Sequence, residues 1–96
     1  MVEPVRIAGN VPKPRKTWNV TPEYPRLARL RRIEGIVILE VTVNRDGNVS
    51  NVSLLRSPVG LEDAAINAVR QWRYEPTIVN ERPVSVIFSE TVRFQM

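Results

Sequence analysis

The sequence predicts an α+β domain in which two helices are packed on one face of a three-stranded antiparallel sheet, in the order helix-strand-strand-helix-strand. The spacing of apolar residues changes from a helical period to alternation at Gly35, and it returns to a helical period after Gly60. Asp46-Gly47, a strong hairpin signal, separates two alternating segments. Alternation is typical of an antiparallel sheet with one covered face, and such a sheet leaves open strand edges.

The chain is expected to divide into a Pro-rich basic lead-in, residues 1–22, and one folded domain, residues 23–96. The lead-in is predicted to be extended because its prolines exclude helix and central strand. These prolines are Pro4, Pro12, Pro14 and Pro22. Within the lead-in, residues 5–7 are predicted to form a short edge strand.

The first helix is predicted to begin at Pro25 and to end at Gly35, because proline suits the first helical position and glycine the position after a helix. Its expected apolar side consists of Tyr24, Leu27, Ala28 and Leu30. Its expected polar side consists of Arg26, Arg29 and Arg32, whereas Arg31 falls within the apolar stripe.

The first strand is predicted to direct alternate residues toward the helices, namely Val37, Leu39, Val41 and Val43. The second strand is predicted at residues 49–56, after the Asp46-Gly47 hairpin. The last strand, residues 84–95, alternates with Glu90 as the one interruption.

The second helix is predicted at about residues 61–72, and Pro76 prevents its continuation. Its apolar stripe consists of Leu61, Ala65, Ala68, Val69 and Trp72. Acidic Glu62 and Asp63 in the first turn, with Arg70 and Arg73 in the last, suit the helix dipole.

The composition argues against an enzyme. The chain has no Cys and no His, which removes zinc sites, thiol chemistry and histidine acid–base catalysis. Glu62 and Asp63 are adjacent on a helix and diverge, and the four glycines form no phosphate-binding loop. We therefore expect no catalytic residue, no metal and no cofactor. No apolar run is long enough to span a membrane, and no signal peptide opens the chain.

The net charge of +4 raises the possibility of a nucleic-acid partner. Four arginines fall within residues 26–32, so an Arg-rich first helix that binds nucleic acid is one alternative function. A charge run on a helix is more commonly its solvated face, and the other arginines are scattered. A sheet that reads RNA should also expose aromatic side chains. We therefore expect no nucleic-acid partner, and salt-dependent binding of DNA or RNA would contradict this.

A series of different short motifs extends along most of the chain. In order, they are Tyr24-Pro25, Ala28, Ile33-Glu34-Gly35, the Val/Leu-rich strand, Asp46-Gly47, Val49, Val52, Ala65, Ala68, Trp72-Arg73-Tyr74-Glu75-Pro76 and the strand at 84–94. Together they resemble the C-terminal domain of TonB proteins over about residues 23–95. Each motif alone is weakly specific, but their order and spacing together are specific.

The resemblance implies the domain of an energy transducer that couples a proton-driven motor in the inner membrane to outer-membrane transporters. Such a protein has an N-terminal membrane helix and a Pro-rich periplasmic linker, and residues 1–22 resemble the end of that linker. The domain would lie in the periplasm, tethered to the inner membrane by a segment missing from this chain. A related TolA-like envelope protein is a further alternative, separable only by its partners or by the missing N-terminal part.

The resemblance also implies the binding site. A transporter's short extended segment, the TonB box, would add as a strand to the last strand of the sheet, in the mode called β-augmentation. The expected contact residues are Val84, Ser85, Val86, Ile87, Phe88, Ser89, Glu90, Thr91 and Val92. A secondary contact is expected at Tyr24 and Pro25, and supporting roles at Gly35, Asp46, Gly47, Trp72, Tyr74 and Pro76. An open edge could also permit a strand-exchanged homodimer.

Three departures from the family pattern lead to hypotheses. Arg31 and Glu90 place charges where the family has small or apolar residues, so the two could pair at the margin of the helix–sheet layer, or each could extend separately to solvent. Asn80-Glu81 replaces the usual Asn-Gly, which leaves the turn type open. Residues 5–7 could also lie against the last strand and mimic the box, or be disordered.

Overall fold

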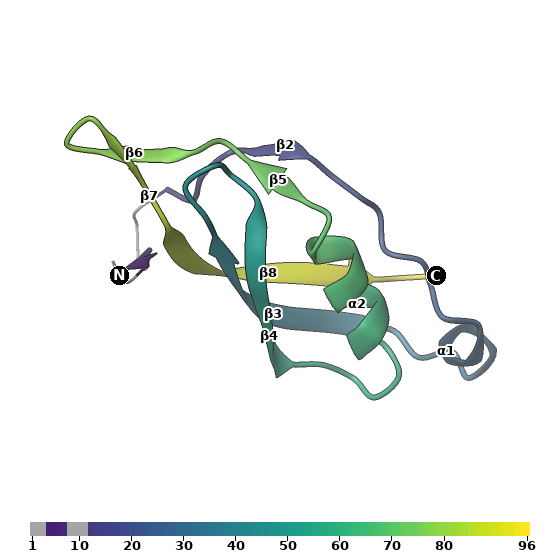
Figure 1. Cartoon of the computed structure of the whole chain (residues 1–96). Helices are drawn as coiled ribbons and strands as arrows, with labels where there is room; N and C mark the ends of the chain where they lie inside the picture. Colours follow the sequence, from purple (N-terminus) through teal and green to yellow (C-terminus); the bar gives the residue numbers. More distant parts are fainter. Residues whose placement is uncertain (1–3, 8–11) are drawn as a thin grey trace.

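The computed structural model describes residues 4–7 and 12–96 (Figure 1). Its main sheet has four strands in the order β1-β8-β3-β4: β1 (Val5–Arg6), β8 (Val86–Phe94), β3 (Gly35–Val43) and β4 (Val49–Arg56). The last three strands are antiparallel, as predicted, and β1 is added parallel to β8. The fold is α+β, but the expected three-stranded sheet was incomplete because part of the lead-in joins it.

Strand β3 lies at the centre of the sheet, as its alternation predicts. Val37, Leu39, Val41 and Val43 are each at most 1% exposed and form the middle of the core. The pairing with β8 runs without a break from Gly35 opposite Phe94 to Val43 opposite Val86. One face of the sheet is therefore covered, and the other faces solvent.

The β3–β4 hairpin confirms the Asp46-Gly47 turn. The side-chain oxygen of Asn44 accepts hydrogen bonds from the backbone N–H groups of Asp46 and Asn48, both at 3.0 Å. Gly47 has a φ of 90° and is buried, and its carbonyl accepts a 2.9 Å bond from the N–H of Tyr74. Glycine is needed here because a Cβ would lie 2.0 Å from the Tyr74 carbonyl oxygen.

Helix α2 (Glu62–Val69) covers the sheet, and its predicted apolar stripe is buried throughout. It ends earlier than expected because the N–H groups of Gln71 and Trp72 bond to carbonyls three residues back, which tightens the last turn. Arg73 then enters a strand, so the predicted basic last turn was wrong. At the other end, the Glu62 carboxylate accepts a 2.7 Å bond from the N–H of Gly60.

Helix α1 (Arg26–Leu30) departs most from the prediction. It is a five-residue helix that lies beyond the end of the sheet and does not cover its face (Figure 1). Only Ala28 is buried, whereas Leu27 is 65% and Leu30 69% exposed. Arg32, with a φ of 55°, ends the helix well before Gly35. The helical spacing of the apolar residues corresponds to a real helix at Arg26–Leu30, but the apolar side of this helix does not face the core.

Four short strands form two further sheets. β2 (Lys16–Trp18) pairs with β5 (Arg73–Tyr74), and β6 (Thr77–Val79) pairs with β7 (Arg82–Val84). The last strand was predicted as one unit but divides at Ser85, whose hydroxyl donates a 3.0 Å bond to the Val43 carbonyl. Asn80 and Glu81 both have positive φ, of 51° and 67°, which is the backbone of a type I′ hairpin turn. Neither helix of the described part is long and apolar enough to cross a membrane.

Candidate functional site

The outer edge of β8 offers fewer binding groups than the nine predicted residues suggest. In an antiparallel strand, the N–H and C=O of one residue point to the same side, and this side alternates along the strand. Ser85 and the odd-numbered residues of β8 direct these groups away from β3, because the Ser85 and Ile87 carbonyls accept bonds from the N–H groups of Val5 and Ile7. The candidate edge is therefore formed by the backbone of Ser85, Ile87, Ser89, Thr91 and Arg93.

The even-numbered residues of the predicted site serve the core. Val86, Phe88 and Val92 are at most 5% exposed, and their backbones face β3. Val84 lies in β7, where it and Ser85 line a groove of about 590 Å³ next to Arg45. The sequence prediction missed Arg93, although its odd position relative to the buried Val92 and Phe94 was a usable signal.

Part of this edge is already paired with the lead-in. The Val5 N–H donates a 2.8 Å bond to the Ser85 carbonyl, and the Ile7 N–H donates a 2.9 Å bond to the Ile87 carbonyl. Of the two alternatives for residues 5–7, the structure thus supports the one in which they lie against the last strand. In the described part of the chain, no strand pairs with the outer side of Ser89, Thr91 or Arg93, whose side chains are exposed.

The Arg6 side chain adds an ion pair to this contact. Its guanidinium lies 2.9 Å from the carboxylate of Glu40, a β3 residue that is opposite Ser89 in the sheet. The Arg6 side chain therefore reaches across β8 to contact Glu40 on the uncovered face of the sheet. The sequence prediction did not single out Glu40, although it is the one charged residue in β3.

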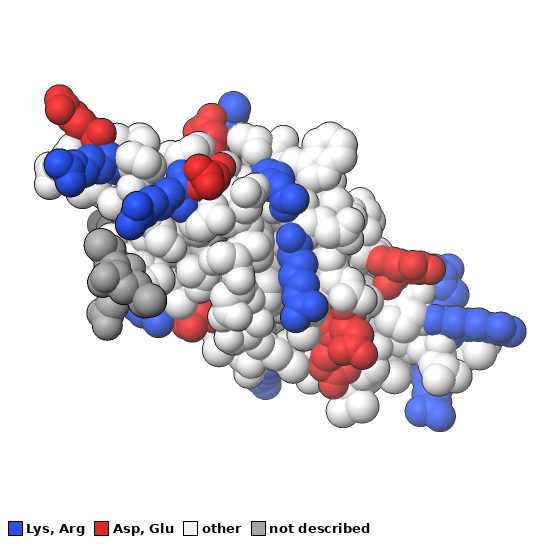
Figure 2. Space-filling model, viewed as in Figure 1, with Lys and Arg blue, Asp and Glu red and all other residues white. Residues whose placement is uncertain are grey.

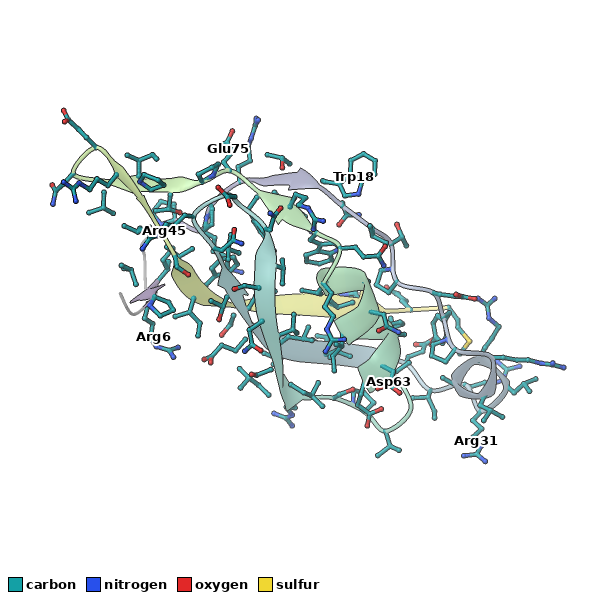
Figure 3. All side chains as sticks on the ribbon, viewed as in Figure 1. Arg6, Trp18, Arg31, Arg45, Asp63 and Glu75 are labelled. Atoms are coloured by element: carbon teal, nitrogen blue, oxygen red, sulfur yellow. The ribbon has the colours of Figure 1, made fainter. Side chains whose placement is uncertain are left out.

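Glu90 does not pair with Arg31, so that hypothesis was wrong. Glu90 points to the covered face, where it accepts a 2.6 Å bond from the Tyr74 hydroxyl and lies 3.0 Å from the Lys13 ammonium group. Arg31 is exposed at the far end of the molecule (Figure 3). Burial, followed by the hydrogen bond to Glu90, raises the pKa of Tyr74 far above its usual value. The Glu90 carboxylate on β8 thus helps to hold Lys13, and with it the lead-in, on the domain.

Further contacts hold residues 12–20 on the domain. The Lys16 ammonium group lies 3.3 Å from the centre of a Trp72 ring, and partial burial lowers the pKa of Lys16. The Trp72 indole N–H donates a 2.8 Å bond to the Val20 carbonyl, and Arg15 lies 3.1 Å from the Glu75 carboxylate. This part of the lead-in packs on the folded domain. The assignment of residues 1–22 to a linker stays a prediction.

The predicted supporting residues other than Gly35 lie around β5, between the hairpin and β8. Trp72 and Tyr74 are at most 5% exposed, and the Tyr74 ring packs edge-to-face on Phe88 with centroids 5.3 Å apart. Asp46 is exposed beside Gly47, and Pro76 follows β5 at the surface. Gly35 begins β3 with a φ of 149°, and a Cβ there would lie 2.7 Å from the Pro58 ring. The last set of predicted contacts, Tyr24 and Pro25, lies at the opposite end of the sheet from β1.

Tyr24 and Pro25 have local structural roles there. The Tyr24 hydroxyl donates to the Ile33 carbonyl, and its ring packs edge-to-face on Phe94 with centroids 5.5 Å apart. Pro25 precedes the first residue of α1. A partner contact at these residues stays a prediction.

The charges do not form one continuous basic surface on the face drawn in Figure 2. Figure 2 shows basic side chains around the α1 end and along the rest of this face, with acidic groups between them. No aromatic side chain lies on the uncovered face of β3, β4 or β8, because Phe88 and Phe94 point into the core. Among residues 4–7 and 12–96, no group of acidic side chains is arranged to hold a metal ion.

Comparison with known proteins gives a consistent result. The family model described as Gram-negative bacterial TonB protein C-terminal matches residues 20–96. Protein TonB of Vibrio cholerae is 37% identical over 79 residues, which are 80% of this chain and 32% of that protein. Protein TonB of Escherichia coli is 42% identical over 65 residues, which are 66% of this chain and 27% of that protein. The chain thus spans about a third or less of these relatives.

A solved structure supports the same assignment. The solution NMR structure of the Pseudomonas aeruginosa TonB CTD is similar with a TM-score of 0.71 and 26% identity. The match covers 91% of this chain and 90% of that one. With the order of elements, the motif spacing and the family match over residues 20–96 in agreement, the chain belongs to the family of Gram-negative bacterial TonB C-terminal domains.

Proposed function

We propose that this domain binds the TonB box of outer-membrane transporters by strand addition to β8, and that it transmits energy derived from the proton-motive force for substrate uptake. The observation that carries the proposal is the pairing of β1 with β8, because it supports the idea that this edge accepts an extended segment through backbone hydrogen bonds. Ser89, Thr91 and Arg93 would extend the same edge for a longer strand.

Backbone binding suits a transducer that needs no chemistry of its own. The family is a non-enzymatic interaction domain, and this site requires no catalytic residue, metal or cofactor. A strand pulled along its length loads several hydrogen bonds together, so the contact resists force better than one bond would. The force would reach β8 and pass to β3, with which β8 pairs over its whole length.

The wider context belongs to the same proposal. The relatives are longer proteins, and in them other segments would contact the inner-membrane motor and place this domain in the periplasm. A nucleic-acid partner is disfavoured by the aromatic-free uncovered face of the sheet and by the mixed charge on the face drawn in Figure 2. A second copy of the chain could also add its own strand at β8, giving a strand-exchanged dimer that sedimentation at several concentrations would detect.

An NMR titration with synthetic TonB-box peptides from transporters of the same genome tests the proposal. We expect amide shifts at Ile87, Ser89, Thr91 and Arg93, with a smaller shift at Tyr24, the predicted secondary contact. A proline scan of the peptide supplies the matched control, because proline has no N–H. Proline should weaken binding at alternate peptide positions, which point their N–H groups at β8. Shifts confined to α1, or equal loss at every proline position, would contradict strand addition.

A further inference from the structure

The segment β1 is held differently from the rest of the lead-in. Residues 12–20 are fixed by the β2–β5 pairing, by Lys13 on Glu90 and by Trp72 on Val20, and none of these contacts depends on β1. β1 itself has two residues, and Val5 is 45% exposed. Residues 5–7 contact the domain through two backbone bonds to Ser85 and Ile87, through the Arg6–Glu40 ion pair and through the partly buried Ile7 side chain. Short exposed segments of this kind open at little cost in free energy.

We infer that residues 5–7 are a displaceable stand-in for the partner strand, and that Glu40 is the side chain that holds them in place through Arg6. The inference rests on the proposed function, because competition requires that a partner strand use the same edge of β8. The lead-in then regulates access to the site, and the chain supplies its own competitor.

Glu40 is well placed for this role. It is the only acidic side chain on the uncovered face of β3, β4 and β8, since Glu90 on β8 points to the other face. Its side chain is 26% exposed, and Arg6 crosses β8 to lie 2.9 Å from it. Figure 3 shows Arg6 beside β1, at the end of the molecule opposite Arg31. An added strand that carries a cation at the position of Arg6 would keep this ion pair, so Glu40 also favours such a partner.

The expected change in a partner's affinity depends on how often the tethered residues 5–7 leave β8. Residues 12–20 keep β1 near its site, so its effective concentration there is high and pairing recurs after each opening. A partner's apparent affinity falls in proportion to the fraction of open molecules. An exposed ion pair shifts such an equilibrium by about two- to fivefold. Loss of the Arg6–Glu40 pair should therefore raise the affinity for a partner strand by at most about that factor.

Amide hydrogen exchange in the 96-residue chain tests the contact directly. The Val5 and Ile7 amides should exchange at least about two- to fivefold faster in Arg6→Glu than in the natural chain, because the reversal removes the ion pair and adds repulsion from Glu40. The double reversal Arg6→Glu/Glu40→Arg should restore slow exchange, and Arg31→Glu, a matched reversal at the far end, should leave it unchanged. Equal rates in the natural chain and Arg6→Glu, or no restoration by the double reversal, would overturn the role of Glu40.

Titration of the same variants with a TonB-box peptide tests the competition. The peptide should carry no charge opposite Glu40, so that only the loss of β1 changes its affinity. Arg6→Glu removes the ion pair and adds repulsion from Glu40, so it should bind the peptide at least about twofold more tightly than the natural chain or Arg31→Glu. Equal affinities overturn the competition while the proposed function stands. If neither chain binds the peptide, the proposed function fails and the competition fails with it, whereas the exchange result still judges the Arg6–Glu40 contact.

Discussion

Replacing Tyr74 with Phe removes one hydroxyl from the contact between β5 and β8 and leaves the ring in place. The hydroxyl donates a 2.6 Å bond to the Glu90 carboxylate, and Tyr74 is only 3% exposed. A hydrogen bond to a charged group contributes about 1.5–3 kcal/mol. Glu90 keeps its ion pair with Lys13 and some access to water, so we expect the lower part of this range, about 1.5–2 kcal/mol.

Lys13→Met is the matched comparison, because it removes the other partner of Glu90. The Lys13 side chain is 50% exposed, so this ion pair should contribute only about 0.2–1 kcal/mol. Tyr74→Phe should therefore cost more stability than Lys13→Met. Urea unfolding followed by tryptophan fluorescence measures both costs. With a slope of about 1–1.5 kcal/mol per molar urea, Tyr74→Phe should lower the midpoint by about 1–2 M without changing the slope.

Two results would refute this reasoning. A loss below about 0.5 kcal/mol for Tyr74→Phe would show that the Tyr74–Glu90 bond contributes little net free energy. An equal or larger loss for Lys13→Met would show that the exposed ion pair, and not the buried hydroxyl, holds Glu90.

The raised pKa of Tyr74 also predicts a pH dependence. Its folded pKa lies above its unfolded value of about 10, so its contribution is complete below pH 10 and is lost as the pH rises further. The loss approaches about 1.4 kcal/mol per pH unit. The lowered pKa of Lys16 acts in the opposite direction over a neighbouring range, so the difference between the natural chain and Tyr74→Phe isolates Tyr74. This difference in stability should shrink as the pH rises from about 10 to 11, and a constant difference would contradict the prediction.

The turns give two further predictions. Glu81→Gly should stabilise the domain by about 0.5–1 kcal/mol, because Glu81 has a φ of 67° in a turn that prefers Asn-Gly. Calorimetry should show a melting point a few degrees higher. The control Glu81→Gln keeps the Cβ and should show no gain. Gly47→Ala should cost more than about 2 kcal/mol, because its Cβ would lie 2.0 Å from the Tyr74 carbonyl oxygen. Gly60→Ala, whose added Cβ would lie 3.7 Å from the Cδ1 of Ile33, should cost less in the same denaturation assay, and equal costs would exclude the close approach of β5 as the cause.

The sequence predicted the covered face of the sheet because burial there follows a simple period. Val37, Leu39, Val41 and Val43 alternate, and all are buried as expected. It failed at α1 because helical spacing shows that side chains share a direction, and does not show what lies in that direction. Leu27 and Leu30 share a side of α1, but the helix lies beyond the sheet and that side meets solvent.

The sequence predicted which stretch of the chain contains the candidate edge, but not which residues in that stretch form it. The sequence could locate the last strand, but the division of its residues between core and edge depends on which neighbour each backbone group faces. The partners of Glu90 were also beyond the sequence, because Lys13 and Tyr74 lie 77 and 16 residues away along the chain. Arg31 was a reasonable partner for Glu90 on charge alone, but it lies at one end of the molecule, and Glu90 binds Lys13 and Tyr74 instead.

The sequence by itself determined the family, the hairpin, the apolar stripe of α2 and the central place of β3, because each depends on local spacing and on residue types. Only the tertiary structure decided that β1 lies on the edge of β8, that Glu40 reaches Arg6 and that Glu90 holds the lead-in. The physical reason is that an added strand is recognised by backbone groups, which all residues except proline present in the same form.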